Sequence, residues 1–244
     1  MKPVIIAHRG NNYTYPENSL EGLHSAFKLG CAAVEFDIQM LADGTLVILH
    51  DDNTLRTSGV NKEVLMSNYG EMQAISVHEP ERFSEEHLPT PVSKLESFMA
   101  LLEEYPARHA YIEVKEESLK KWGRQEMINK LLPIIKDYTK QCTVVSFDLP
   151  VLDLIRNQSD LTIGWVLYNY DKASLQKAQH TKPDYLIVDQ AELEFDTPPW
   201  QGPWKWMVYG VDSAEQAIKH YENGVGYIET DFLGRLLADE RLKA

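Results

Sequence analysis

The sequence lacks long hydrophobic runs and contains little cysteine. It has no run of about 18 apolar residues, the length that a membrane-spanning helix needs. The four apolar residues Val4–Ala7 are too few for the core of a secretory signal. The two cysteines, Cys31 and Cys142, are far apart and fit no zinc-binding or CxxC spacing. We therefore expect a cytoplasmic protein without a membrane span, whose two thiols are buried and reduced.

Positive charge is also scarce. Lysine and arginine number 24 against 37 acidic residues, which gives a formal net charge of −13. Binding to nucleic acid needs clustered cations that replace the counterions of the phosphates, and no such cluster is present. A small anionic substrate remains compatible with this charge if a few cations line a cleft. The motifs GxGxxG, Walker A, GxSxG and HExxH are absent as well.

Short apolar runs rich in Val, Ile and aromatic residues alternate with amphipathic stretches along all 244 residues. Repeated β-α units of this kind indicate a parallel sheet covered by helices. Eight units favour a single (β/α)8 TIM barrel over residues 1–244, and an open doubly wound sheet is the alternative. The expected strands are Val4–Ala7, Ala33–Ile38, Tyr111–Val114, Thr143–Phe147, Leu161–Leu167, Tyr185–Val188, Trp204–Val208 and Val225–Ile228. The expected helical stretches are Asn18–Gly30, with Asn18 as N-cap, Leu95–Tyr105, Ser118–Tyr138, Leu149–Asn157, Ala173–Gln179 and Ser213–Asn223.

Two segments depart from this alternation. Asp43-Gly44 precedes the β-prone run Thr45–His50, which is typical of a hairpin after the second strand. The polar residues 51–91 then form a small insertion on one face of the barrel, for which we expect no separate core. Between Val188 and Trp204, the sequence DTPPWQGPW excludes a regular helix.

Carboxylates alternate with apolar residues on the second expected strand. Because side chains of a strand point to opposite faces in turn, Glu35 and Asp37 share one face and Val34, Phe36 and Ile38 the other. If the apolar set packs against helices, both acids point into the barrel. The alternative is an exposed edge strand with solvated acids.

The third expected strand repeats the pattern, with Glu113 and Lys115 on one face. Buried unpaired charges cost several kcal/mol each, so three gathered carboxylates are protonated or hold a cation. Oxygen ligands suit one hard divalent cation, Mg²⁺ or Ca²⁺. The candidate ligands are therefore Glu35, Asp37 and Glu113. A simple ion pair between Glu113 and Lys115 is the alternative.

Two histidines stand at expected strand ends, where the active sites of such barrels gather. His8 ends the first strand in IIAHRG and His50 ends the hairpin strand in VILHDD. Each can donate or accept a proton near neutral pH, although a single histidine of this kind is more often structural. Arg9 can fork two hydrogen bonds onto a phosphate, and Lys115 supplies a second cation. The pattern favours chemistry on a small phosphate ester.

Taken together, these motifs resemble those of the glycerophosphodiester phosphodiesterase family, in its short cytoplasmic bacterial form. The resemblance implies the (β/α)8 barrel and metal-dependent hydrolysis of a glycerophosphodiester to glycerol 3-phosphate and an alcohol. It further implies that Glu35, Asp37 and Glu113 bind the metal, that Arg9 and Lys115 contact the phosphate, and that His8 and His50 are the base and the acid. The segments that carry it are His8-Arg9-Gly10, Pro16-Glu17-Asn18-Ser19, Glu35-Phe36-Asp37, Asp43-Gly44, His50-Asp51-Asp52, Leu88-Pro89-Thr90, Ile112-Glu113-Val114-Lys115, Ser146-Phe147-Asp148 and Ile228-Glu229-Thr230-Asp231.

One segment departs from the family pattern. Trp206-Met207-Val208-Tyr209 stands where many members have a sequence resembling Trp-Thr-Val-Asn, so the preferred alcohol is open. A lysophospholipase D-like or other phosphodiesterase on the same barrel is therefore an alternative. Two others are a barrel that binds phosphate esters without turnover and a metal-free cyclising phospholipase. The sequence leaves the oligomeric state open.

Overall fold

Eight parallel strands form a closed barrel in the computed structural model, which describes residues 2–194 and 196–243. Each barrel strand pairs with the next barrel strand along the chain. The ring is closed because β1 pairs both with β2, where Ile6 lies opposite Ala33, and with the last strand, β10. The (β/α)8 prediction is confirmed, and the open sheet is excluded. The barrel strands are β1 (Val4–Ala7), β2 (Ala33–Met40), β5 (His109–Val114), β6 (Cys142–Ser146), β7 (Thr162–Val166), β8 (Tyr185–Asp189), β9 (Lys205–Tyr209) and β10 (Tyr227–Thr230).

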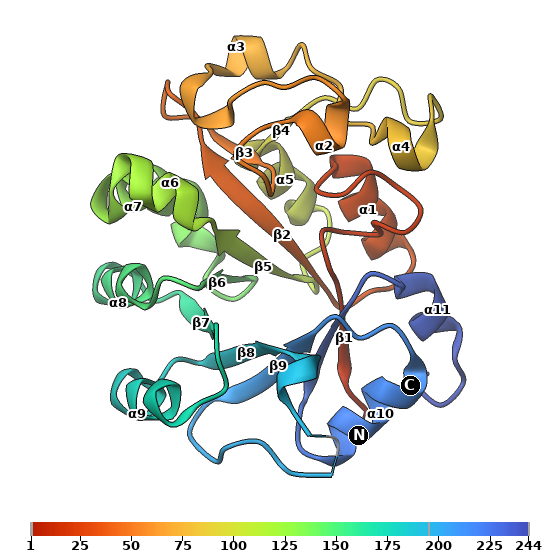
Figure 1. The fold of residues 1–244 in the computed structure, drawn as a ribbon, viewed down its shortest axis with the longest axis vertical. Coiled ribbons are helices and arrows are strands. Elements are labelled where there is room, and N and C mark those ends of the chain that lie inside the picture. The colour runs from red at the N-terminus through yellow and green to blue at the C-terminus, as the bar shows by residue number, and fades with distance from the viewer. Residues whose placement is uncertain (1, 195, 244) are drawn as a thin grey trace.

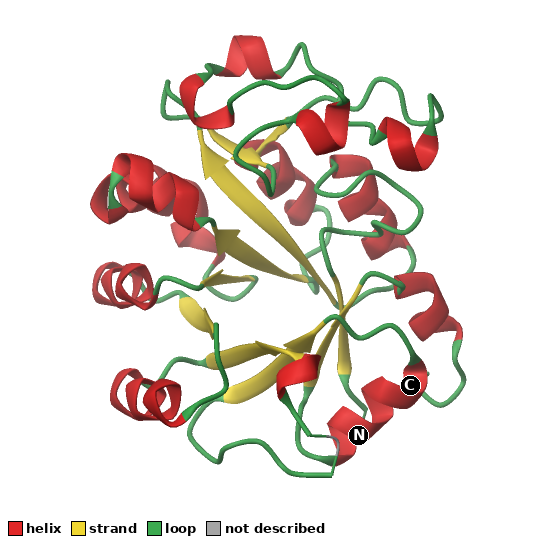
Figure 2. Cartoon of the chain, viewed as in Figure 1, coloured by secondary structure: helices red, strands yellow, loops and turns green. Residues whose placement is uncertain are grey.

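Helices surround the barrel on its outer side (Figures 1 and 2). Within the described residues, none of them has the length and apolar character needed to cross a bilayer. Between β8 and β9 the described part of the chain forms only the short 3-10 helix η3 (Gln190–Glu192), as the proline-rich sequence predicted. The surrounding helices are α1 (Leu20–Lys28), α5 (Leu95–Glu103), α6 (Glu116–Trp122), α7 (Arg124–Ile135), α8 (Leu149–Gln158), α9 (Lys172–Thr181), α10 (Ala214–Glu222) and α11 (Leu233–Ala238).

The main core lies between the barrel wall and these helices. On β2 the outward residues Val34, Phe36 and Ile38 are fully buried there. The ring of Phe36 meets that of Phe98 on α5, with centroids 4.4 Å apart. A second, smaller cluster includes Tyr111, whose neighbours Ala110 and Ile112 pack outward. Inner and outer residues thus alternate along each strand, as the pleat requires.

Two differences between the predicted and the observed helices have a clear local cause. The N-cap of α1 is Ser19, whose hydroxyl accepts from the backbone N–H of Gly22, whereas Asn18 adopts a left-handed φ of 56° and turns its side chain elsewhere. The stretch 118–138 is divided at Gly123, where φ is 85°. Glycine adopts this backbone conformation readily, so α6 ends and α7 begins at that residue. The helix α11 was not predicted.

The hairpin and the insertion extend the sheet beyond the barrel. β3 (Leu46–Ile48) runs antiparallel to β2, and β4 (Ser93–Lys94) runs antiparallel to β3. The intervening chain forms α2 (Leu55–Ser58), η1 (Val64–Met66), α3 (Tyr69–Met72) and α4 (Pro80–Phe83). Contrary to expectation, this segment shares a separate hydrophobic cluster with the hairpin, since Val64 and Met72 of the insertion are fully buried together with Val47 of β3. The sequence did not predict this cluster, because its apolar residues are widely spaced within a mostly polar segment.

Removing the aromatic ring of Phe98 tests the packing of α5 on the barrel. Phe98 is fully buried, so Phe98→Ala leaves a cavity and should destabilise the protein by about 3–5 kcal/mol in chemical unfolding. Leu29→Ala is the control, because Leu29 is 50% exposed. Equal unfolding midpoints for the two variants would contradict this packing.

Candidate metal centre and active site

Three carboxylates converge at the carboxyl end of the barrel strands. Glu35 and Asp37 are on β2, and Glu113 lies directly opposite Asp37 on β5. Glu35 and Asp37 are only 4% and 1% exposed. One oxygen from each of the three residues lies within 4.8 Å of the others. The structure thus brings together the three acids that the sequence singled out.

The inward orientation of the acids has two local causes. The apolar partners of Glu35 and Asp37 occupy the outer core, which leaves the acids the inner face of the strand. Asn18 then fixes Asp37 from the preceding loop. Its Nδ2 donates to Asp37 Oδ2 at 2.9 Å, and its Oδ1 accepts from the backbone N–H of Asp37 at 3.2 Å. The left-handed backbone of Asn18 therefore serves the site rather than the helix cap.

Both predicted cations contact these acids. The Nε of Arg9 lies 3.2 Å from Asp37 Oδ2, and its Nη1 donates to Glu17 at 3.0 Å. The Nζ of Lys115 lies 2.9 Å from Glu113 and 3.5 Å from Asp37. The ion pair between Glu113 and Lys115 therefore exists together with the acid cluster rather than in place of it.

The electrostatics of the cluster favour a bound cation. Burial raises the pKa of Asp37, but Arg9 and Lys115 outweigh it and hold that pKa well below its ordinary value. Burial and the charge of Asp37 raise the pKa of Glu35 well above the ordinary value and that of Glu113 to about 6. Two of the acids therefore resist ionisation unless further positive charge is present. An all-oxygen donor set of buried carboxylates fits a hard divalent cation.

His8 is oriented by a carboxylate on the loop that follows the last barrel strand. Its Nδ1 lies 2.6 Å from Asp231 Oδ1, and Asn12 donates to the same oxygen at 2.6 Å. The other ring nitrogen, Nε2, faces Glu35 at 3.9 Å and Glu229 at 3.7 Å. Burial lowers the pKa of His8, but Glu229 and Asp231 outweigh it and raise that pKa above 6.5.

His50, which also lines the cavity, is held by a carboxylate in the same way. Its Nδ1 lies 2.7 Å from Asp51 Oδ1. Asp51 is held by Arg56 on α2, with an Nε–Oδ2 distance of 2.8 Å, and Arg56 also donates twice to Glu17 at 2.7 Å. Because a carboxylate occupies one ring nitrogen, the other is left to exchange a proton with a bound molecule.

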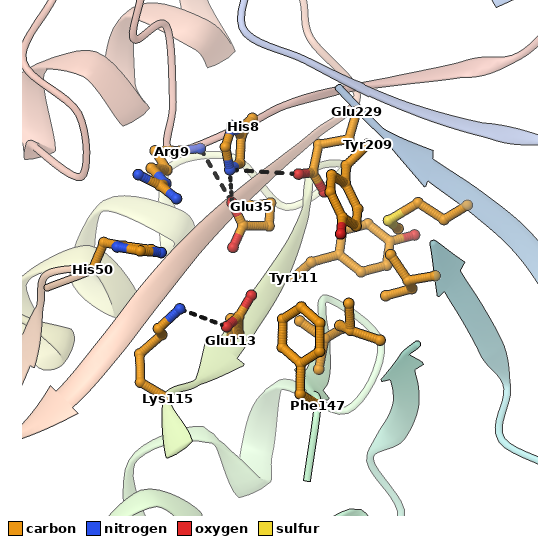
Figure 3. A pocket seen from close by; sticks show the side chains of 14 residues that line it. His8, Arg9, Glu35, His50, Tyr111, Glu113, Lys115, Phe147, Tyr209 and Glu229 are labelled. Carbon is orange, nitrogen blue, oxygen red and sulfur yellow. Dashed lines mark hydrogen bonds and ion pairs between the residues drawn. The ribbon is translucent and has the colours of Figure 1, made fainter. Parts of the chain in front are cut away.

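A cavity of about 190 Å³ joins these groups. Figure 3 shows Arg9, His50 and Lys115 on one side of it and Tyr209 and Glu229 on the other. The cavity therefore has a cationic half that suits a phosphate and an aromatic half that suits a less polar group. The apolar remainder of the lining is contributed by Val145, Phe147, Val166, Ile187 and Met207, together with Tyr111.

Glu229 and Asp231 belong to the site, although the sequence motif that contains them received no role. The signal was available, because Ile228-Glu229-Thr230-Asp231 alternates as β2 does and ends the last barrel strand. Glu17 and Arg56 were missed for a different reason. They lie on a loop and within the insertion, where no periodicity indicates the direction of a side chain.

The fold and site define a barrel whose carboxyl-end cavity combines an acid cluster, two cations and two carboxylate-anchored histidines. A model of the glycerophosphoryl diester phosphodiesterase family matches residues 8–235, and the chain belongs to this family. The family resemblance expected from the sequence motifs is confirmed.

Individual relatives match only parts of the chain. A glycerophosphodiester phosphodiesterase of Caldanaerobacter subterraneus is 34% identical over 93 residues, which are 37% of this chain and 38% of that protein. A mouse lysophospholipase D, GDPD3, is 26% identical over 137 residues, or 56% of this chain and 40% of that protein. The matched segments thus span well under two thirds of the length of these relatives.

Solved structures share the fold over nearly the whole chain. A phosphodiesterase of Oleispira antarctica in complex with the product sn-glycerol-3-phosphate has a TM-score of 0.84 at 22% identity, covering 96% of this chain and 95% of that one. A glycerophosphodiester phosphodiesterase of Agrobacterium tumefaciens has a TM-score of 0.77 at 19% identity, covering 98% and 100%.

Binding of Mg²⁺ or Ca²⁺ should weaken as the pH falls from about 7.5 to about 5.5, because the ion must displace protons from its ligands. The pKa of Glu113 is raised to about 6, so Glu113 takes up a proton in this range. Burial and the neighbouring charges raise the pKa of Glu35 as well, which also favours its protonated form. Calorimetry in buffers of different ionisation enthalpy measures the affinity and the protons released. An affinity that does not change with pH would contradict the acid cluster as the binding site.

Proposed function

We propose that this protein is a metal-dependent phosphodiesterase that hydrolyses glycerophosphodiesters to glycerol 3-phosphate and an alcohol. One observation carries the proposal: two histidines, each anchored through Nδ1 by a carboxylate, line the same cavity as the acid cluster and its two cations. Membership of the phosphodiesterase family supports it, and so does the glycerol 3-phosphate bound by the Oleispira protein of the same fold.

Glu35, Asp37 and Glu113 would hold one Mg²⁺ or Ca²⁺, for which their oxygen donors are suited. Such an ion, when bound, stabilises the negative charge that develops on the phosphoryl oxygens. Arg9 and Lys115 bind the phosphate from the cationic half of the cavity, where both are positioned by the acids. With one divalent ion and one phosphodiester, the formal charges of these groups sum to zero.

The two histidines move the protons. His8 accepts a proton at Nε2 from the glycerol hydroxyl next to the phosphate, and that oxygen attacks phosphorus. His50 donates a proton to the alcohol oxygen as its bond to phosphorus breaks, which leaves a cyclic phosphate. Water then opens the ring, giving a proton to His50, and the glycerol oxygen recovers its proton from His8. Asp231 and Asp51 keep both rings in the orientation that these transfers need.

Removing a proton donor or a metal ligand should abolish most of the activity. His50→Ala and Glu35→Gln should each lower kcat by at least about 10², the usual effect of losing a general acid or a charge-stabilising group. The assay couples release of glycerol 3-phosphate to a dehydrogenase, with Mg²⁺, Ca²⁺ or EDTA present. His180→Ala is the matched control, because His180 is exposed on α9. Wild-type rates in either site variant, or full activity in EDTA, would contradict the mechanism.

The aromatic half of the cavity favours a second candidate, a lysophospholipase D-like activity. Tyr209 lines the cavity where many family members carry a polar residue, and Phe147 lies on the same side. We expect Tyr209→Asn to change the ratio of kcat/KM between a lysophospholipid and glycerophosphoethanolamine by about tenfold, the effect of altering one apolar contact. Product analysis on both substrates measures this ratio. Turnover of the lysophospholipid alone would replace the first candidate by the second, and binding without turnover of either would refute both.

A further inference from the structure

Glu229 is a buried carboxylate that the proposed reaction does not use. It ends β10 on the inner face of the barrel and is only 5% exposed. Its side chain projects into the cavity opposite the cationic half (Figure 3). Its carboxylate accepts no hydrogen bond from the residues that the structure describes, and its one ion-pair contact is with Nε2 of His8 at 3.7 Å. A buried acid without hydrogen bonds is costly unless a cation compensates its charge.

Glu229 completes a second group of convergent ligand atoms. One atom each from His8, Glu35 and Glu229 lies within 4.8 Å of the other two. His8 Nε2 is 3.9 Å from Glu35 and 3.7 Å from Glu229. Zinc binds nitrogen and oxygen ligands at about 2.0–2.2 Å, so pairs of atoms at these separations can contact one ion. Glu35 belongs to this group and to the acid cluster, and its two oxygens can serve two ions.

The histidine is arranged as metal-binding histidines are. Its Nδ1 is held by Asp231, which Asn12 holds in turn, so the lone pair of Nε2 is directed toward the two glutamates. Ligating histidines in metalloproteins are oriented by a carboxylate in this way. One imidazole with two carboxylates suits Zn²⁺, whereas Mg²⁺ prefers oxygen ligands alone. The two neighbouring groups therefore differ in the ion that they select.

The charge balance of the cavity also favours a cation beside Glu229. One divalent ion and a phosphodiester already neutralise the acid cluster with Arg9 and Lys115, so an ionised Glu229 adds one uncompensated negative charge. A cation beside Glu229 compensates it. Without a metal ion, His8 is the one cationic partner that Glu229 has among the described residues. The lysine and the arginine of the cavity are engaged elsewhere, since Lys115 contacts Glu113 and Asp37 and Arg9 contacts Asp37 and Glu17.

We propose that His8, Glu35 and Glu229 form a second cation site that takes Zn²⁺, and that zinc bound there inhibits the enzyme. Inhibition follows because zinc occupies the lone pair of His8 Nε2 that accepts the substrate proton. The inhibitory effect rests on the proposed function, whereas zinc binding at this site does not.

The binding experiment uses the full chain, stripped of metal and then saturated with Mg²⁺, in the absence of substrate. Zn²⁺ is titrated by calorimetry, and the imidazole nitrogens are followed by NMR. The wild type should bind one Zn²⁺ per chain with a shift of the His8 Nε2 resonance. Glu229→Gln should weaken zinc binding by at least about tenfold, as loss of a ligand does. Glu229→His, which restores a nitrogen ligand, should recover most of the affinity.

Glu215→Gln on α10 is the charge-matched control, because Glu215 is exposed and pairs with Lys219 on the same helix. It should bind zinc as the wild type does. If Glu229→Gln also keeps wild-type zinc affinity, or if the His8 resonance does not respond to zinc, the site is refuted. The Glu229→His variant keeps the test decisive should Glu229→Gln fold poorly.

The inhibition experiment separates this proposal from the proposed function. In excess Mg²⁺, zinc should inhibit wild-type hydrolysis, and Glu229→Gln should need at least about tenfold more zinc for half-inhibition of its own rate. Equal half-inhibition concentrations would overturn the inhibitory role. If the chain hydrolyses no phosphodiester but binds zinc through Glu229, the function fails and the zinc site stands.

Discussion

The site depends on the enforced proximity of buried carboxylates. Glu35, Asp37 and Glu113 come from two adjacent strands into a small space where their charges repel, and Glu35 and Asp37 are buried there. Arg9 and Lys115 stabilise Asp37 as an anion, while the pKa values of Glu35 and Glu113 remain raised. The remaining repulsion is what a divalent cation relieves. In the function proposed above, binding of the metal, of the phosphate and of protons at this site is therefore coupled through this electrostatic imbalance.

Side-chain alternation and strand register in the barrel make this proximity possible. Alternation along β2 places apolar side chains under α5 and acids inside, and the register of β5 sets Glu113 directly beside Asp37. Loops at the same end of the barrel supply side chains that hold these carboxylates and the histidines in place. Asn18 fixes Asp37 from the first loop, and Arg56 of the insertion holds the carboxylate that orients His50. The insertion thus contributes to positioning His50 as well as extending the sheet.

The sequence predicted those parts of the structure that leave a regular pattern of apolar and polar residues. The eight barrel strands follow from short apolar runs, and the inward direction of Glu35, Asp37 and Glu113 follows from the alternation of apolar and polar residues on the second and third of them. The N-cap of α1 and the break at Gly123 were not predicted, because Ser19 and Asn18 are both good caps and a glycine can lie inside a helix or end it. Contacts such as Arg56 with Glu17 join segments distant in the sequence, so no local pattern indicates them.

Anomalous diffraction from crystals grown with Mn²⁺ in place of Mg²⁺ tests the central claim most directly. Our account predicts one strong peak enclosed by oxygens of Glu35, Asp37 and Glu113, and its loss in crystals of Glu35→Gln. Ordered side chains with no peak between them, and with Arg9 and Lys115 as the only counter-charges of the acids, would contradict it.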